Sequence, residues 1–144
     1  MCNSACLSFG LDNLTRPVVE GKDILEVGAF NVNGSLRQDV LLLQPKSYTG
    51  VDIQYGDCVD EICNSYDLVK RFGENSFDVV ITTEMLEHVA DWKLSIKNMK
   101  AVLKVGGHIL ITTRSRGSGY HSYPDDYWRY EEEDMRTIFS DFEI

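Results

Sequence analysis

Short apolar runs rich in β-branched residues recur along the chain, and they alternate with segments whose apolar positions repeat at helical spacing. This alternation is typical of βαβ units, in which helices join parallel strands. The run at residues 77–82 is almost continuously apolar, as expected of an interior strand that is covered on both faces. Strands are expected at residues 22–27, 47–52, 57–62, 77–82 and 108–113.

Helical periodicity is clearest at residues 89–104, where an apolar stripe lies on one side and a row of lysines on another. We interpret the stripe as core and the lysine row as a solvated face. Gly106 and Gly107 are expected to end this helix. Further helices are expected at residues 35–43 and 131–139, and a long polar and aromatic loop at residues 114–130.

The elements predict one domain spanning residues 1–144, because a single domain usually has about 100–200 residues. The expected fold is a Rossmann-like, doubly wound α/β fold with a mostly parallel sheet of about five strands. Apolar residues make up 43% of the chain, and no apolar run approaches the ~20 residues of a membrane-spanning helix. The first residues show no secretory signal pattern, so a cytoplasmic location is expected.

The charge balance disfavours nucleic-acid binding. The chain has 14 Lys and Arg against 23 Asp and Glu, which gives a net charge of −9. A phosphate backbone would therefore be repelled on average. Residues 120–144 contain eight of the acidic residues and two of the basic ones, so the excess negative charge lies mostly near the end of the chain.

The four cysteines, at positions 2, 6, 58 and 63, are not spaced as zinc ligands, and no His follows them at ligand spacing. Because the chain shows no secretion signal, we expect four reduced thiols and no metal site.

Candidate chemistry lies at the carboxyl ends of the expected strands, where open α/β sheets bind their ligands. A loop that begins at Gly28 and ends at Gly34 follows the first strand, and Asp52 closes the second strand 24 residues after Gly28. This layout is typical of a nucleoside site, in which the acid binds the ribose hydroxyls. Phe30 stands where a dinucleotide loop needs its second glycine, and no Lys follows Gly34 as it would in a P-loop. With Glu26 at the strand end, the loop favours a ligand that has a cationic centre and an amino group but no phosphates.

In these segments the chain resembles class I S-adenosylmethionine-dependent methyltransferases, and most of all the type 11 methyltransferase domain. The likeness covers about residues 23–113, with the elements in the family's order. Its most diagnostic part is the Phe-Asp-Val-Val strand at residues 77–80 followed by Leu-Glu-His at residues 86–88. The matching segments are residues 24–28, 31–37, 50–52, 76–80, 84–89 and 103–107.

The resemblance implies that S-adenosylmethionine is the cofactor and that methyl transfer is the reaction. Glu26, Gly28 and Gly34 would shape the pocket for the methionine part, and Thr83 and Glu84 would lie by its amino group. The full set that the resemblance assigns to cofactor binding is Glu26, Gly28, Ala29, Phe30, Gly34, Asp52, Ile53, Asn64, Ser65, Thr83 and Glu84.

For the nucleoside part, the resemblance implies that Asp52 binds the ribose hydroxyls and that Ile53 packs on the adenine. Asn64 and Ser65 stand where the family often has an Asp-Ala pair beside the adenine ring. Asn64 is therefore a departure from the family's pattern.

No catalytic dyad or triad stands out, because methyl transfer depends mainly on holding the two reacting atoms in line. His121 and Tyr127, in the loop at residues 114–130, are the candidates for meeting an acceptor, and a mere packing role for this loop is the alternative. His88 is interpreted as a structural residue that orients the segment after the fourth strand. The acceptor is expected to be a small molecule, whose identity the residues leave open.

The family's sheet normally has seven strands, whereas residues 141–144 could only begin a sixth. Strands six and seven are therefore expected to be truncated, which would leave the pairing groups of the fifth strand exposed. We expect a second copy of the chain to cover this edge as a homodimer. Two other functions stay open, a non-catalytic module that binds S-adenosylmethionine or S-adenosylhomocysteine, and a Rossmann enzyme that binds a nucleotide sugar or nicotinamide.

Overall fold

The computed structural model describes residues 4–120 and 125–144. Its centre is a five-stranded sheet in the order β3-β2-β1-β4-β5, with every described strand pair parallel. The predicted α/β fold is therefore confirmed. The strands are β1 (Asp23–Val27), β2 (Ser47–Asp52), β3 (Glu61–Ile62), β4 (Phe77–Thr83) and β5 (Leu103–Thr112).

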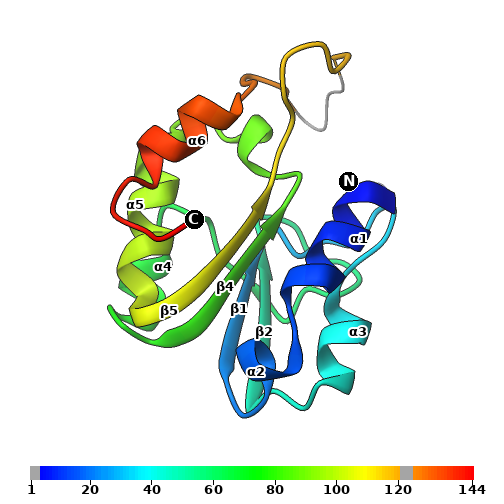
Figure 1. Ribbon diagram of the computed structural model, residues 1–144, viewed down its shortest axis with the longest axis vertical. Helices are drawn as coiled ribbons and strands as arrows, with labels where there is room; N and C mark the ends of the chain where they lie inside the picture. The colour runs from blue at the N-terminus through cyan, green and yellow to red at the C-terminus, as the bar shows by residue number, and fades with distance from the viewer. Residues whose placement is uncertain (1–3, 121–124) are drawn as a thin grey trace.

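Helices cover both faces of the sheet (Figure 1). One face carries α1 (Ser4–Asn13), α2 (Arg16–Val19) and α3 (Arg37–Leu42). The other carries α4 (Leu68–Phe72), α5 (Trp92–Val102) and α6 (Glu132–Ile138). A short 3₁₀ turn, η1 (Leu86–His88), follows β4. Of these, α1, α2 and α4 are absent from the sequence-based prediction, since none of them shows a long apolar stripe.

Two apolar cores result from the alternation of side chains along the strands. Ile24 of β1 packs with Leu14 and Val40 on the side of α1–α3. The next residue, Leu25, packs with Ile96 and Met99 of α5 on the opposite side. All six side chains are buried. The sheet is thus held between two apolar layers, and its carboxyl edge is left to carry the site.

Helix α5 shows both a confirmed and a wrong prediction. Its apolar stripe is core, because Ile96 and Met99 are buried. Gly106 and Gly107 do not end the helix, which stops at Val102. Leu103 already pairs with Phe77 of β4, and the ladder resumes with His108 opposite Val79. The glycines therefore lie in an irregular part of β5, because pairing with β4 begins before the apolar run that marked the strand.

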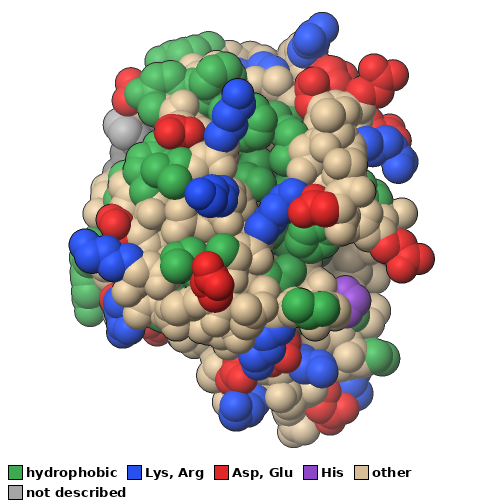
Figure 2. All heavy atoms as spheres, turned by 90° about the vertical axis from the view of Figure 1, so that its left-hand side faces the viewer, with side chains coloured by type: hydrophobic (Ala, Val, Ile, Leu, Met, Phe, Trp, Pro, Cys, Tyr) green, Lys and Arg blue, Asp and Glu red, His purple; other side chains and the backbone are tan. Residues whose placement is uncertain are grey.

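The lysine row is only partly a solvated face. The Lys100 ammonium donates to the carbonyl oxygen of Ile138 at 2.7 Å and so joins α5 to the end of α6. Lys104 forms an ion pair with Asp78 at 2.9 Å. On the face that carries α5 and α6, cationic side chains are interspersed with acidic and apolar ones and form no continuous basic patch (Figure 2).

Several smaller features follow the expectations in part. Helix α6 lies within the expected range 131–139, and Glu131 caps it in a reciprocal capping box with Asp134. The third strand is shorter than expected and contains only residues 61–62. Cys6, Cys58 and Cys63 form no disulfide within the described part of the chain, and Cys2 lies outside the described residues.

Neither a metal cluster nor a membrane span occurs in the described part of the chain. No three His, Cys, Asp or Glu side chains among residues 4–120 and 125–144 are grouped so that they could hold a metal ion. None of the helices in these ranges has both the length and the apolar character needed to cross a bilayer.

Candidate functional site

A cavity of about 290 Å³ opens at the carboxyl ends of β1, β2, β3 and β4. This edge is the usual ligand position in an open parallel sheet, where the chain switches from one side of β1 to the other. The eleven residues that the sequence assigned to cofactor binding all line this cavity. Residues that the sequence did not single out also line it, among them Tyr66, Met85, Val89 and Ala90.

The loop after β1 is held in place by β2. The amides of Gly28 and Ala29 both donate to the carbonyl oxygen of Val51, at 2.9 and 3.0 Å. Gly28 has φ +79, and a Cβ atom there would lie 2.6 Å from Cγ of Met85. Only glycine fits this conformation and this contact without strain, so the backbone of the loop can lie close to a ligand.

Phe30, which breaks the glycine-rich pattern of a dinucleotide loop, is accommodated by a glycine elsewhere in the chain. A Cβ atom on Gly56 would lie 2.2 Å from the Phe30 ring, so the ring packs directly on the backbone of Gly56. The Phe30 amide meanwhile donates to Oδ2 of Asp52 at 3.1 Å. The bulky residue thus helps to position the strand-end acid.

Asp52 presents an oriented carboxylate to the cavity. Oδ2 accepts from Phe30, and Oδ1 accepts from the amide of Gln54 at 3.0 Å. A carboxylate has about four lone-pair positions, so each oxygen can still accept a hydroxyl of a bound ligand. Beside it, Ile53 has 55% of its surface exposed, which leaves an apolar side chain at the cavity for a flat ring.

The segment after β3 forms the neighbouring wall. Oδ1 of Asn64 accepts from the amide of Tyr66 at 3.0 Å, which closes a local turn. Ser65, between them, is buried at 7% exposure. The side chain of Asn64 therefore stabilises the turn that forms this part of the cavity wall.

Glu26 is a buried acid at the floor of the cavity, with 2% of its surface exposed. Burial raises its pKa to about 7, and the hydrogen bond that Tyr48 donates to Oε2 at 2.7 Å opposes this rise. The positive charge of Arg37 acts in the same direction as Tyr48. A cationic ligand in the cavity would likewise favour the charged carboxylate.

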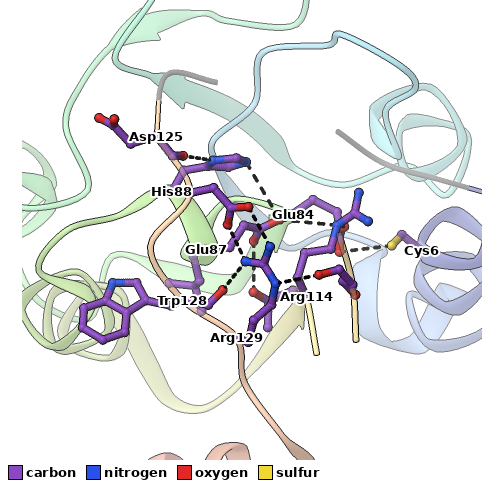
Figure 3. A network of polar contacts seen from close by, with 12 residues as sticks. Cys6, Glu84, Glu87, His88, Arg114, Asp125, Trp128 and Arg129 are labelled. Carbon is purple, nitrogen blue, oxygen red and sulfur yellow. Dashed lines mark hydrogen bonds and ion pairs between the residues drawn. The ribbon is translucent and has the colours of Figure 1, made fainter. Parts of the chain in front are cut away.

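Two further buried acids follow β4 (Figure 3). Glu84 has φ +51, a rare backbone conformation for a residue with a side chain, and such strain is concentrated at functional sites. Its carboxylate accepts from the Cys6 thiol at 3.3 Å and forms an ion pair with Arg114 at 2.6 Å. Glu87 is fully buried, and burial, followed by the nearby charge of Glu84, raises its pKa.

Cys6 and Arg114 are site residues that sequence reasoning missed. They lie 78 residues before and 30 residues after Glu84, and neither belongs to a motif. Only the packing of α1 and of the segment after β5 against the end of β4 brings them together.

The acceptor candidates differ in their outcome. Tyr127 lines the same cavity as the cofactor residues and is half exposed. His121 lies outside the described residues. His88 also lines the cavity, and its Nδ1 contacts the carbonyl oxygen of Asp125. It therefore connects the turn after β4 to the segment around Tyr127.

The charge of the cavity is one-sided. Glu26, Asp52 and Glu84 line it, and no Lys or Arg is among the described residues of its wall. Such a set of carboxylate acceptors fits a cationic ligand with hydroxyl groups and is unfavourable for a pyrophosphate. S-adenosylmethionine has a sulfonium, an ammonium and two ribose hydroxyls, and it meets these requirements.

Comparison with known proteins agrees with this chemistry. The sequence pattern of the methyltransferase domain family matches residues 12–143. The chain belongs to this methyltransferase family. Its membership confirms the resemblance on which the cofactor assignment rests.

Curated relatives of the methyltransferase domain are longer than this chain. The ubiquinone biosynthesis O-methyltransferase of Idiomarina loihiensis is 32% identical over 109 residues, which are 67% of this chain and 44% of that protein. The protein of the same name from Coxiella burnetii (strain Dugway 5J108-111) is 27% identical over 118 residues, which are 73% of this chain and 49% of that protein. The chain thus spans about half the length of these relatives.

Solved structures share the fold. Phosphoethanolamine N-methyltransferase 2 of Haemonchus contortus, in complex with S-adenosyl-L-methionine, has a TM-score of 0.72 at 21% identity, covering 96% of this chain and 36% of that one. The S-adenosylmethionine-dependent methyltransferase of Mesorhizobium loti has a TM-score of 0.62 at 19% identity, covering 78% and 54%. The fold is therefore that of the class I S-adenosylmethionine-dependent methyltransferases.

Proposed function

We propose that this chain binds S-adenosylmethionine in the cavity at the carboxyl edge of its sheet and supports transfer of the methyl group to a small-molecule acceptor. The observation that carries the proposal is that all eleven assigned residues line one and the same cavity. Three carboxylates line it, and no Lys or Arg is among its described residues. Bound there, S-adenosylmethionine supplies a methyl group activated by its sulfonium.

The nucleoside half of the cofactor binds at the ends of β2 and β3. Asp52 accepts the ribose hydroxyls, for which the amides of Phe30 and Gln54 hold its two oxygens in position. Ile53 covers the adenine, and Asn64 and Ser65 form the wall behind it.

The methionine half binds over the loop after β1. Gly28 and Gly34 have no side chain, so the backbone of the loop can lie close to the ligand. The buried Glu26 stabilises positive charge in the cavity. Thr83 and Glu84, at the end of β4, lie on the side of the amino group.

The acceptor enters beside Tyr127. Methyl transfer needs a near-attack arrangement of nucleophile and methyl group, and it needs a base only where the acceptor must lose a proton. The curated relatives are named O-methyltransferases, which favours an oxygen atom as the nucleophile.

A non-catalytic binding module is the second candidate. Binding of the cofactor needs only the cavity, whereas methyl transfer also needs an acceptor site, for which Tyr127 is the candidate among the described residues.

We also propose that a second copy of the chain covers the outer edge of β5. In the described part of the sheet, β5 is ten residues long, lies at one end of the strand order and pairs only with β4. An edge of this length presents a row of backbone groups that can pair with another strand.

Calorimetry with S-adenosylmethionine, S-adenosylhomocysteine and NAD tests the proposed function. We expect the first two to bind and NAD to bind more weakly or not at all, because a pyrophosphate would face the carboxylates of the cavity. Tightest binding to NAD would overturn the proposal. Binding of the first two without methyl transfer to any acceptor in a cell extract would favour the binding module.

A further inference from the structure

Residues 125–130, which we call the strap, run across the turn after β4. The amides of Tyr127 and Trp128 both donate to the carbonyl oxygen of Glu87, at 2.7 and 3.3 Å. The Trp128 indole donates to the carbonyl oxygen of Val89 at 2.8 Å. These bonds attach the strap to residues 87–89, of which His88 and Val89 line the cofactor cavity. Figure 3 shows Trp128 of the strap beside Glu87.

Arg129 joins this strap to the other limb of the same loop. Its guanidinium donates to both carboxylate oxygens of Asp126, with Nη2 2.6 Å from Oδ2. It also donates to the carbonyl oxygens of Ser118, Gly119 and Trp128, at 3.4, 3.0 and 2.7 Å. The planar guanidinium can satisfy such a set of acceptors at once, whereas an ammonium cannot. The Asp126 side chain has no exposed surface, and the Arg129 side chain is 21% exposed, so the pair is largely shielded from solvent.

Tyr127 lies between the two members of this pair in the chain. Its side chain lines the cavity, and its hydroxyl donates to the Asp125 carboxylate at 3.0 Å. Since its own amide is bonded to Glu87 and its neighbour Asp126 is clamped by Arg129, the backbone around Tyr127 is fixed from both sides. These constraints hold Tyr127 in place at the cavity wall.

We propose that Arg129, through Asp126, is a positioning residue that holds Tyr127 in the wall of the cofactor cavity, where its ring contacts the bound cofactor. The inference rests on the proposed function, because the ligand is S-adenosylhomocysteine or S-adenosylmethionine. It goes beyond that function because it assigns the strap to ligand binding, where the alternative is a loop that only packs.

A double-mutant cycle on S-adenosylhomocysteine binding, measured by calorimetry, tests whether Arg129 acts through Tyr127. We expect Tyr127→Ala and Arg129→Lys each to weaken binding by about tenfold, the order of a lost contact. We expect the double variant to bind no more weakly than Tyr127→Ala alone, because coupled residues are not additive. Additive effects, or parental affinity in Arg129→Lys, would overturn the proposal.

Arg129→Lys is chosen because it keeps a positive charge beside Asp126 and loses only the planar guanidinium, which donates to several acceptors at once. Asp126→Asn is a second variant that weakens the same clamp from the other side, and we expect it to lower affinity in the same direction. The matched control is Arg136→Lys, which changes an arginine paired with Glu132 on the exposed side of α6. We expect it to bind as the parent does.

Hydrogen exchange tests the clamp without any ligand. In Arg129→Lys the amides of Tyr127 and Trp128 should exchange at least about tenfold faster than in the parent, because local opening costs less. The amides of α5 should be unaffected. Equal exchange at Tyr127 and Trp128 would overturn the inference. Failure of the parent to bind S-adenosylhomocysteine would overturn its ligand-binding part together with the proposed function.

Discussion

Phe30 and Asp52 are two residues whose relationship is invisible along the chain. Phe30 stands where a dinucleotide loop would have a glycine, and its ring packs on Gly56 while its amide donates to Asp52. The cost of a bulky side chain in the loop is therefore removed by a glycine 26 residues later. The number of glycines in the loop, taken alone, would not have shown that the bulky Phe30 can be accommodated at this site.

Asp52→Ala is expected to weaken S-adenosylhomocysteine binding by at least about tenfold, since two ribose hydroxyls would lose a charged acceptor worth on the order of 1.5–3 kcal/mol. Calorimetry measures the change. Asp39→Ala, a change in the first turn of α3 outside the cavity, is the control. An unchanged affinity in Asp52→Ala would remove the ribose assignment.

Glu26 is expected to make stability depend on pH. Its pKa is about 7 in the folded protein against an ordinary value of 4.5, so the folded state binds the proton more tightly than the unfolded chain. The free energy of unfolding should therefore fall as pH rises from about 4.5 to about 7, by an amount on the order of 3 kcal/mol. Urea unfolding at several pH values measures the slope.

Glu26→Gln should flatten this slope, because an amide does not titrate. Glu20→Gln, on the exposed end of α2, serves as the control and should retain the parental slope. If the parent and Glu26→Gln had the same pH dependence, the buried acid would not be its source.

Helix boundaries were decided by hydrogen bonds at particular residues. Helix α5 begins at Trp92 because the Asp91 carboxylate accepts from the amide of Leu94, and it ends where Leu103 joins the sheet. The periodic stripe extended past both points, because Leu103 after the helix joins the same core and Val89 before it is an apolar residue that lines the cavity. The pattern thus predicted the buried face better than the ends.

Asp91→Ala is expected to lower the free energy of unfolding by about 1 kcal/mol, the usual cost of losing an N-cap. Asp67→Ala is a matched control, because Asp67 also precedes a helix, α4, but makes no side-chain capping bond there. Thermal or urea unfolding of both variants measures the difference. Equal losses would contradict a specific role for the cap.

At the scale of the whole molecule, the carboxyl ends of the strands carry the cavity. The edge strand β5 carries the backbone groups that are proposed to pair with a second copy. Helix α1 reaches the site through Cys6, and the strap reaches it from the segment after β5. A helix that precedes β1 and a segment that follows β5 therefore meet at the end of β4 (Figure 3). This convergence is a property of the fold as a unit.

The proposed pairing through β5 predicts a dimer in solution. Sedimentation of the chain across micromolar concentrations should show a monomer–dimer equilibrium, because edge-to-edge strand pairing buries otherwise unpaired backbone groups. Sedimentation as a monomer throughout that range would contradict the pairing. A parallel run of Asp91→Ala, which alters a helix cap away from β5, should show the same equilibrium as the parent.

The sequence by itself determined where the candidate site residues lie along the strands. An acid and a glycine loop come at the end of the first strand, and a second acid comes at the end of the next. That prediction succeeded because parallel strands must bring their carboxyl ends to one edge, so residues such as Glu26, Asp52 and Glu84 line one cavity. Their charge favoured a cationic ligand without phosphates, and this prediction needed only short-range periodicity and residue chemistry. The cofactor itself, S-adenosylmethionine, was implied by the resemblance to class I methyltransferases.

Only the tertiary structure decided which distant residues complete the site. Arg114 and Cys6 meet at Glu84, Gly56 receives the Phe30 ring, and the strap is bonded to the turn after β4. No local pattern marks these partners, because each contact depends on how α1 and the segment after β5 pack against the finished sheet. Packing at that distance is a property of the whole folded chain, and it completes the surroundings of the cavity at the strand ends.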